Sequence, residues 1–277
     1  MAAVGDIVDG PALRVIGPLE LWHDGMALHL PSARPQTLLV LLALRLGQWR
    51  ETDELIETLW DGRPPRSAGG NLRTYVCQWR KVLTPLSSRM SLESTRGAYR
   101  LNVGRHDLDI GVFEDRLTQG QWALASREAD TAVSHFGAAL RLWRGDPFGS
   151  LGTYAMVERA RLIELRDKAR CGLADALIAQ KRPADAITVL REAVRVQPFD
   201  EQVWARLVSA LAESGRRADA VATYQEIRQL LWDELGMEPG RALVEVHQRL
   251  LGPLSDAGAV ACSCDNAVRA REAGLMA

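Results

Sequence analysis

Residues 67–83 place polar and cationic side chains at helical spacing, a pattern suited to hydrogen bonding with nucleic-acid bases. At about 100° per residue, one side of such a helix is apolar and carries Leu72, Val76, Trp79 and Leu83. The other side holds no acid and carries Arg73, Thr74, Cys77, Gln78, Arg80 and Lys81. Arg and Gln make paired hydrogen bonds to guanine and adenine in the major groove of DNA, and Thr contacts the thymine methyl. The pattern predicts a base-reading helix; an ordinary amphipathic surface helix, which usually mixes Glu with Lys and Arg, is the alternative.

The charge distribution favours the same segment. The 277 residues have a net charge of only −1. Residues 62–105, however, contain nine basic residues and a single acid, Glu93, giving +8, whereas residues 1–61 sum to −5 and residues 106–277 to −4. Clustered positive charge is typical of a surface that binds a phosphate backbone, although a solvated face has the same composition.

The elements before this helix are short strands and two helices. Residues 12–30 contain β-prone runs broken by turn residues at Gly17-Pro18 and Asp24-Gly25, which predicts three or four short strands. Leucines from position 38 to Leu46 predict a mostly buried helix entered through Pro35. Thr52 is the expected N-cap of a second helix that stops at Asp61-Gly62.

The elements after the loop complete a winged helix-turn-helix. Ser67 or Asn71 is expected to cap the basic helix, and residues 91–103 predict two strands joined at Arg96-Gly97. In that arrangement the basic helix enters the major groove while Arg96 and Tyr99 of the wing reach the backbone or the minor groove. Arg96 is the stronger candidate, because Tyr99 is better suited to the core than to a DNA contact.

Helical periodicity dominates from His106 onward, with an internal repeat. At an offset of 34 residues, Leu173 matches Leu207 and Ala184-Asp185-Ala186 matches Ala218-Asp219-Ala220. Thirty-four is the tetratricopeptide period, and Trp204, Gly215 and Tyr224 fit that pattern. The expected fold is mainly α with a small β component. Its expected parts are an N-terminal tail (1–11), a winged helix-turn-helix (12–104), an all-α tetratricopeptide-like domain (105–252) and a disordered tail (253–277).

Other classes of protein are disfavoured. The sequence has no phosphate-binding loop, zinc-protease or serine-hydrolase motif and no clustered Cys/His ligands, so we expect no enzyme, cofactor or metal site. Cys262 and Cys264 form a lone pair to which we assign no role. No signal peptide or membrane span is evident, which predicts a cytoplasmic protein with no membrane partner.

Several strings together resemble a known family. In the N-terminal half these are LRVIGPLEL (13–21), Pro64-Pro65, Trp79-Arg80-Lys81 and Arg96-Gly97-Ala98-Tyr99-Arg100-Leu101, which resemble the OmpR-type winged helix. In the C-terminal half they are Leu142-Trp143-Arg144-Gly145, Arg161-Leu162 and Glu234-Leu235-Gly236-Met237-Glu238-Pro239-Gly240. The combination is similar to the bacterial transcriptional activation domain of the Streptomyces antibiotic regulatory proteins, over about residues 12–252.

The resemblance implies a transcriptional activator of secondary-metabolite genes. It implies binding as a dimer to direct repeats in double-stranded promoter DNA near the −35 element, recruitment of RNA polymerase holoenzyme through its sigma and alpha subunits, and a location at the nucleoid. By analogy, Asp61, Arg63 and Arg66 in the loop before the basic helix contact polymerase, although a plain connector fits equally well. Gly69-Gly70, Cys77 and Gln78 depart from the family pattern and leave the preferred DNA sequence open.

Three other functions fit parts of the sequence. One is a winged-helix repressor, and another is a sensor whose helical domain binds a small molecule. The third is a helical-repeat scaffold whose N-terminal domain no longer binds DNA.

Overall fold

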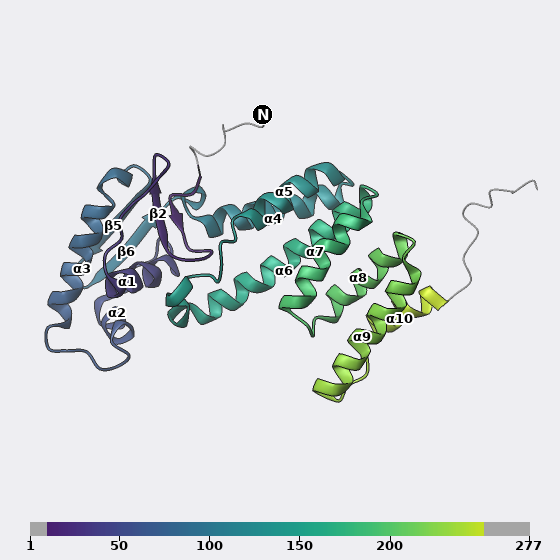
Figure 1. Cartoon of the computed structure of the whole chain (residues 1–277). Helices are drawn as coiled ribbons and strands as arrows, with labels where there is room; N and C mark the ends of the chain where they lie inside the picture. Colours follow the sequence, from purple (N-terminus) through teal and green to yellow (C-terminus); the bar gives the residue numbers. More distant parts are fainter. Residues whose placement is uncertain (1–9, 252–277) are drawn as a thin grey trace, which may run out of the picture.

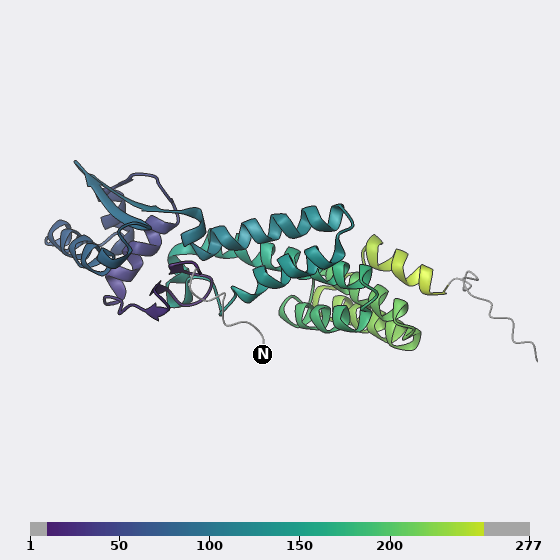
Figure 2. The same cartoon turned by 90° about the horizontal axis from the view of Figure 1, so that it is seen from above.

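The described part of the chain opens with short strands and three helices and continues as a row of helical pairs (Figure 1). The computed structural model describes residues 10–251. Seen from above, the helical pairs extend away from the N-terminal part as an elongated arm (Figure 2). None of the helices in residues 10–251 combines the length and the apolar character of a membrane span.

Two small antiparallel sheets frame the N-terminal helices. The first has the order β1-β2-β3 and consists of Leu13–Arg14, Glu20–His23 and Met26–Ala27. The second has the order β4-β6-β5 and consists of Arg50–Glu51, Ala98–Val103 and Met90–Thr95. In the sequence, α1 (Ala33–Ala43) lies between β3 and β4, and α2 (Thr52–Leu59), α3 (Ala68–Val82) and the 3-10 turn η2 (Thr84–Leu86) lie between β4 and β5. This order confirms the predicted winged helix-turn-helix.

The predicted end of the first helix was wrong by three residues, and the predicted N-cap of the second by one. Helix α1 stops at Ala43, and Leu46 lies outside it with 37% of its surface exposed. Thr52 is the first residue of α2, while Glu51 occupies the N-cap. Backbone pairing explains the second shift, because Glu51 pairs with Ala98 as the last residue of β4 and the chain turns directly from strand into helix.

The helical part consists of stacked antiparallel pairs. They follow the short 3-10 turn η3 (Arg105–Asp107), and a further 3-10 segment, η4 (Gly149–Ala155), separates the first pair from the second. The pairs are α4 (Asp109–Ala125) with α5 (Ala129–Arg141), α6 (Met156–Ala179) with α7 (Pro183–Val196), and α8 (Glu201–Glu213) with α9 (Arg217–Leu235). Helix α10 (Arg241–Leu251) packs on α8 and α9 and closes the row.

The 34-residue repeat is present in the geometry. Lys181 and Gly215, 34 positions apart, both adopt left-handed backbone angles, with φ of 60° and 78°. The next residue in each repeat donates from Nε to an aspartate three positions on, at 2.7 Å in both: Arg182 to Asp185 and Arg216 to Asp219. Each turn is therefore built in the same way, as the tetratricopeptide period predicts.

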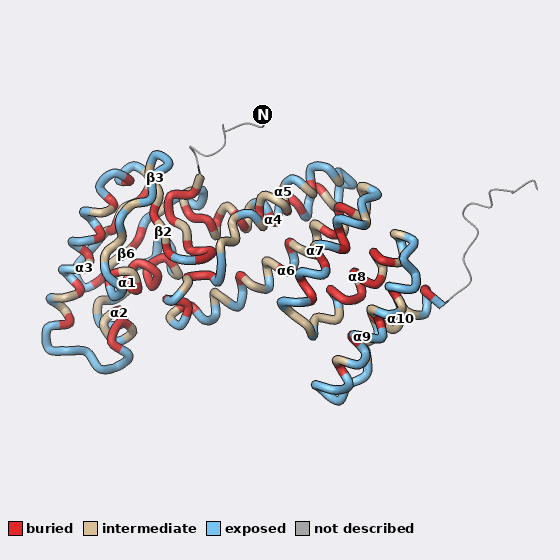
Figure 3. The backbone as a smooth tube through the Cα atoms, viewed as in Figure 1, coloured by how far each residue is buried: buried red, intermediate tan, exposed pale blue. Residues whose placement is uncertain are grey.

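The hydrophobic core does not divide where the two expected domains meet. One cluster of buried residues runs from Ala12 to Ala176 and includes strand residues of β1 together with Phe113, Phe136 and Phe148. A second cluster runs from Ala174 to Leu250. Figure 3 shows buried backbone continuing from the small sheets into α4–α6. The winged helix and the first helical pair therefore share one core, although the chain passes between them near residue 105.

Phe136 shows how tightly the first helices pack. Its side chain is fully buried, between Gly120 of α4 and Gly172 of α6. A Cβ atom at either glycine would lie within 2.8 Å of the ring. The two glycines therefore make the space that lets α5 insert an aromatic ring between its neighbours.

Candidate nucleic-acid interface

Helix α3 has the two faces that its sequence predicts. Leu72, Val76, Trp79 and Leu83 are all at most 3% exposed. The Trp79 indole donates a hydrogen bond to the Pro35 carbonyl at 2.6 Å, which fixes α3 to the start of α1. The polar face is exposed at Arg73, Thr74, Cys77, Gln78, Arg80 and Lys81. The fold thus holds one side of α3 rigidly and presents the other to solvent.

The loop between α2 and α3 is short and exposed. Asp61 and Gly62 have left-handed φ values of 49° and 75°, and the Gly62 amide donates to the Glu57 carbonyl at 2.9 Å, which ends α2. Asp61, Arg63 and Arg66 all point into solvent. The stacked rings of Trp60 and Tyr75, with centroids 6.2 Å apart, join the two helices behind the loop.

The wing is the β5–β6 hairpin, and Arg96 lies at its tip. The two-residue turn Arg96-Gly97 has Gly97 at φ 85°, a conformation that favours glycine. Arg96 is exposed, whereas Tyr99 is half-buried and packs against the first core. The hairpin confirms the predicted turn, and it places Tyr99 in β6 opposite Ser94 and Arg50.

Three of the nine basic residues in 62–105 are neutralised by acids. Arg89 pairs with Asp107. Arg100 pairs with Glu93 at 2.5 Å, and this bond lowers the pKa of Glu93. Arg105 pairs with Glu114 and Asp115 at 2.8 Å each. The six cations without an ion pair in the described part of the chain are Arg63, Arg66, Arg73, Arg80, Lys81 and Arg96. All of them lie on α3, on the loop before it or at the wing tip.

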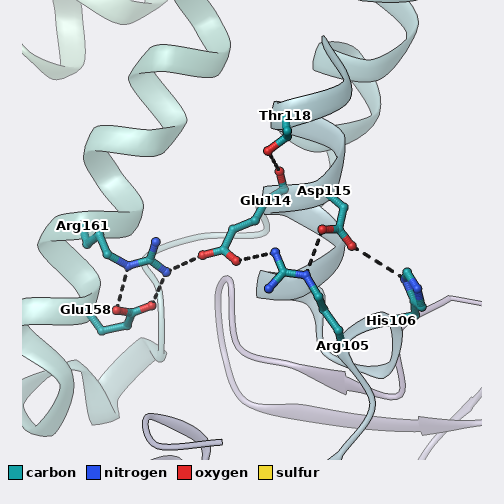
Figure 4. Close-up of polar contacts among 7 residues, drawn as sticks. All are labelled: Arg105, His106, Glu114, Asp115, Thr118, Glu158 and Arg161. Atoms are coloured by element: carbon teal, nitrogen blue, oxygen red, sulfur yellow. Dashed lines mark hydrogen bonds and ion pairs between the residues drawn. The ribbon is translucent and has the colours of Figure 1, made fainter. Parts of the chain in front are cut away.

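A chain of ion pairs connects the end of the wing domain to the helical arm (Figure 4). The Glu114 carboxylate of α4 lies between two arginines: it accepts from Arg105 at 2.8 Å and from Arg161 of α6 at 2.6 Å. Arg161 also bonds Glu158, and the carboxylates of Glu158 and Glu114 raise the pKa of Arg161. Asp115 adds a bond to Arg105 at 2.8 Å and lies 3.8 Å from the ring of His106. Residues of η3, α4 and α6 are thus linked by ion pairs where the chain passes from the winged helix to the helical arm.

Asp109 holds the N-terminal sheet against the arm. Its side chain is 1% exposed, and its Oδ2 accepts from the backbone amides of Val15 and Ile16 at 2.8 Å each. Arg144 contributes a longer contact to the same oxygen at 3.4 Å and an ion pair to Glu20 at 2.8 Å. Burial raises the pKa of Asp109, while the two amides and Arg144 act in the opposite direction.

Sequence reasoning did not find these junction residues. Asp109 has the position of an ordinary first-turn acid of a helix, and its partners lie 93 and 94 residues away. Within residues 10–251 there is no group of three or more His, Cys, Asp or Glu side chains that could hold a metal ion. Cys262 and Cys264 lie outside the described residues.

Fold and surface together define a winged helix-turn-helix protein with a tetratricopeptide-like arm. Residues 108–251 match the family model of the bacterial transcriptional activator domain. The chain is 30% identical over 252 residues to the regulatory protein DnrI of Streptomyces peucetius, covering 86% of this chain and 91% of that protein. It belongs to the Streptomyces antibiotic regulatory protein family of transcriptional regulators.

Other relatives are longer proteins. The chain is 32% identical over 243 residues to the transcriptional regulatory protein EmbR of Mycobacterium tuberculosis, covering 86% of this chain and 62% of EmbR. It is 34% identical to the regulatory protein AfsR of Streptomyces coelicolor, covering 86% of this chain but only 24% of AfsR. A solved structure of M. tuberculosis EmbR in complex with a low affinity phosphopeptide superposes with a TM-score of 0.78 at 31% identity, covering 87% of this chain and 65% of that one. The chain therefore spans less than two thirds of EmbR.

Proposed function

We propose that this chain is a sequence-specific DNA-binding transcriptional activator that acts on RNA polymerase. The observation that carries the proposal is the exposed, acid-free face of α3 beside a wing tipped by Arg96, where none of the exposed cations is neutralised by an acid of the described chain. In the proposed complex, α3 lies in the major groove. Arg73, Thr74, Gln78 and Lys81 contact bases or phosphates there, and Arg96 contacts the backbone or the minor groove.

The finer parts of the proposal concern the promoter. We propose that two copies bind direct repeats near the −35 element of genes in a secondary-metabolite cluster. The protein would therefore be located at the nucleoid. The loop before α3 has exposed side chains at Asp61, Arg63 and Arg66, so these side chains are free to contact the sigma or alpha subunit of polymerase. Family membership and the exposure of this loop support these assignments. Footprinting upstream of the surrounding genes, with and without polymerase, tests them together.

Binding to direct repeats predicts a strong dependence on repeat spacing. Two winged helices that contact each other on one face of the duplex need half-sites about 10–11 base pairs apart. Inserting five base pairs turns one half-site to the opposite face, so we expect the two-copy complex in a gel-shift titration to weaken at least about tenfold. An insertion of a full turn is the control and is expected to restore part of the affinity. Equal affinity at all three spacings would contradict paired binding.

The predicted contacts differ in their effect on salt dependence. If the three cations assigned to DNA, Arg73, Lys81 and Arg96, neutralise phosphates, the slope of log affinity against log salt is about −3 for each bound copy, from roughly −0.9 per contact. Lys81→Ala is expected to flatten the slope by about 0.9 and to weaken target and random DNA equally. Gln78→Ala, the matched neutral variant one turn back on the same face, is expected to weaken target DNA alone by about tenfold. A wild-type slope near zero would contradict this surface as the DNA-binding face.

A further inference from the structure

Arg80 is one of the cations predicted to contact DNA, but its guanidinium is turned toward the wing. Its Nε donates to the Leu92 carbonyl at 3.0 Å, and its Nη2 donates to the Ser94 hydroxyl at 2.8 Å. Both acceptors belong to β5, which is the edge strand of the β4-β6-β5 sheet. The same side chain therefore connects the base-reading helix to the outer strand of the hairpin.

Arg80 supplies a hydrogen-bond donor to a backbone carbonyl of the edge strand that has no strand partner. A strand at the edge of a sheet has outward-facing backbone groups with no neighbouring strand to pair them. The Leu92 carbonyl is such a group, and Arg80 supplies its donor. The planar guanidinium fork suits two acceptors separated along one strand, which a single ammonium group does not match. The arrangement is thus specific to arginine.

The two hydrogen bonds of Arg80 to Leu92 and Ser94, called the Arg80 brace below, lie close to the wing tip. Ser94 lies two residues before Arg96, which is about 7 Å along a strand. On its other side the hairpin is held by β4, a strand of only two residues that pairs with Ala98 and Tyr99. The side of the wing that faces α3 is therefore held near its tip through Arg80.

We propose that Arg80 is a positioning residue that sets the wing relative to α3, so that Arg96 and the base-reading face reach the same DNA segment together. This inference rests on the proposed function, because its readout is DNA binding. It assigns base readout on α3 to the other exposed side chains and gives Arg80 an indirect part in affinity. Substituting Arg80 is expected to lower DNA affinity because the displaced wing no longer places Arg96 against the DNA.

The first test is a double-mutant cycle of Arg80→Lys and Arg96→Ala, measured as affinity for the target promoter by fluorescence anisotropy. Arg80→Lys keeps the positive charge but loses the fork, and we expect about a tenfold loss. Arg96→Ala is expected to cost about as much in wild type, but less than about twofold in the Arg80→Lys background, since the wing is already displaced. Affinity of Arg80→Lys within twofold of wild type, or losses that multiply, would overturn the proposal.

The second test removes the other partner of the brace and changes no charge. Ser94→Ala is expected to weaken binding about threefold, as loss of one hydrogen bond would. Thr95→Ala is the matched control on the same hairpin, because Thr95 makes no side-chain hydrogen bond to α3 among the described residues, and it is expected to leave affinity unchanged. Equal effects of the two variants would count against the brace.

Salt dependence gives a readout that a purely structural role would not move. Arg80→Lys is expected to flatten the slope of log affinity against log salt by about 0.9 although no charge is removed, because the Arg96 phosphate contact is lost. An unchanged slope contradicts the inference. If wild-type protein itself shows no preference for promoter DNA, the proposed function fails; if wild type binds and the cycle is additive, only the role of Arg80 fails.

Discussion

Asp109→Ala is expected to lower the free energy of unfolding by about 3–5 kcal/mol. The carboxylate is almost fully buried and accepts both the Val15 and the Ile16 amide at 2.8 Å. Alanine leaves these two amides without an acceptor and removes one partner of Arg144, in a place that water does not reach. Denaturation in urea at pH 7 measures the effect as a lower midpoint and is expected to show the first core unfolding as a unit.

Asp109→Asn is the matched control. Its amide oxygen is able to take the position of Oδ2 and accept from both backbone groups, so we expect a loss several-fold smaller than that of alanine. The two variants also separate the charge from the hydrogen bonds. Losses of equal size would show that the amides of Val15 and Ile16 do not depend on this acceptor.

The stability difference between wild type and Asp109→Asn is expected to depend on pH with a definite sign. Burial raises the pKa of Asp109 in the folded protein, against the opposing effect of the two amides and Arg144. A folded state with a raised carboxyl pKa binds the proton more tightly than the unfolded chain, so ionisation costs stability. The stability of wild type relative to Asp109→Asn is therefore expected to fall as the pH rises through this raised pKa. A difference that grows with pH would contradict the direction of the shift.

The faces of α3 could be predicted because they depend on local spacing alone. Leu72, Val76 and Trp79 recur at three- and four-residue intervals, and that spacing defines a buried side in any amphipathic helix. The same holds for the hairpin, where Arg96-Gly97 marks the turn. Neither inference requires knowledge of what the element packs against, and both are confirmed.

One ion pair follows from the sequence through the register of the hairpin. A two-residue turn at positions 96 and 97 places residues equally far from it opposite each other, so Glu93 must face Arg100. The structure has this register and an ion pair at 2.5 Å. The pair of Arg100 with Glu93 leaves the net charge of residues 62–105 at +8. It shows, however, that Arg100 is not among the cations free to contact DNA.

The pairs at the junction could not have been found in this way. Glu114 meets Arg161 across 47 residues, and Asp109 meets Val15 across 94. No periodicity links such positions, because the contacts exist only once the N-terminal sheet has docked on α4 and α6. The shared core has the same origin, so the expected boundary at residues 104 and 105 describes the path of the chain better than its packing.

Gly111→Ala is expected to destabilise the protein by about 2 kcal/mol or more at this junction. Gly111 lies in the first turns of α4, and a Cβ there would overlap the carbonyl oxygen of Arg105 and lie 2.8 Å from the Cγ of that side chain. Alanine gains up to about 1 kcal/mol of helix propensity over glycine, but a clash with backbone cannot be relieved by a rotamer change. Thermal unfolding measures the loss as a lower Tm.

Gly70→Ala is the matched control, since it makes the same substitution in the first turn of α3, where a Cβ would meet nothing within 4 Å. It is expected to stabilise the protein by up to about 1 kcal/mol, so the two variants should move Tm in opposite directions.

Relief of the clash at Gly111 requires η3 to move away from α4, and this movement strains the bonds of Arg105 to Glu114 and Asp115. Gly111→Ala is therefore expected to change the orientation of the wing domain on the arm as well as stability, and to weaken binding to paired repeats more than to a single half-site. Equal weakening on both DNAs would mean that the junction contributes stability but does not set how two copies are arranged.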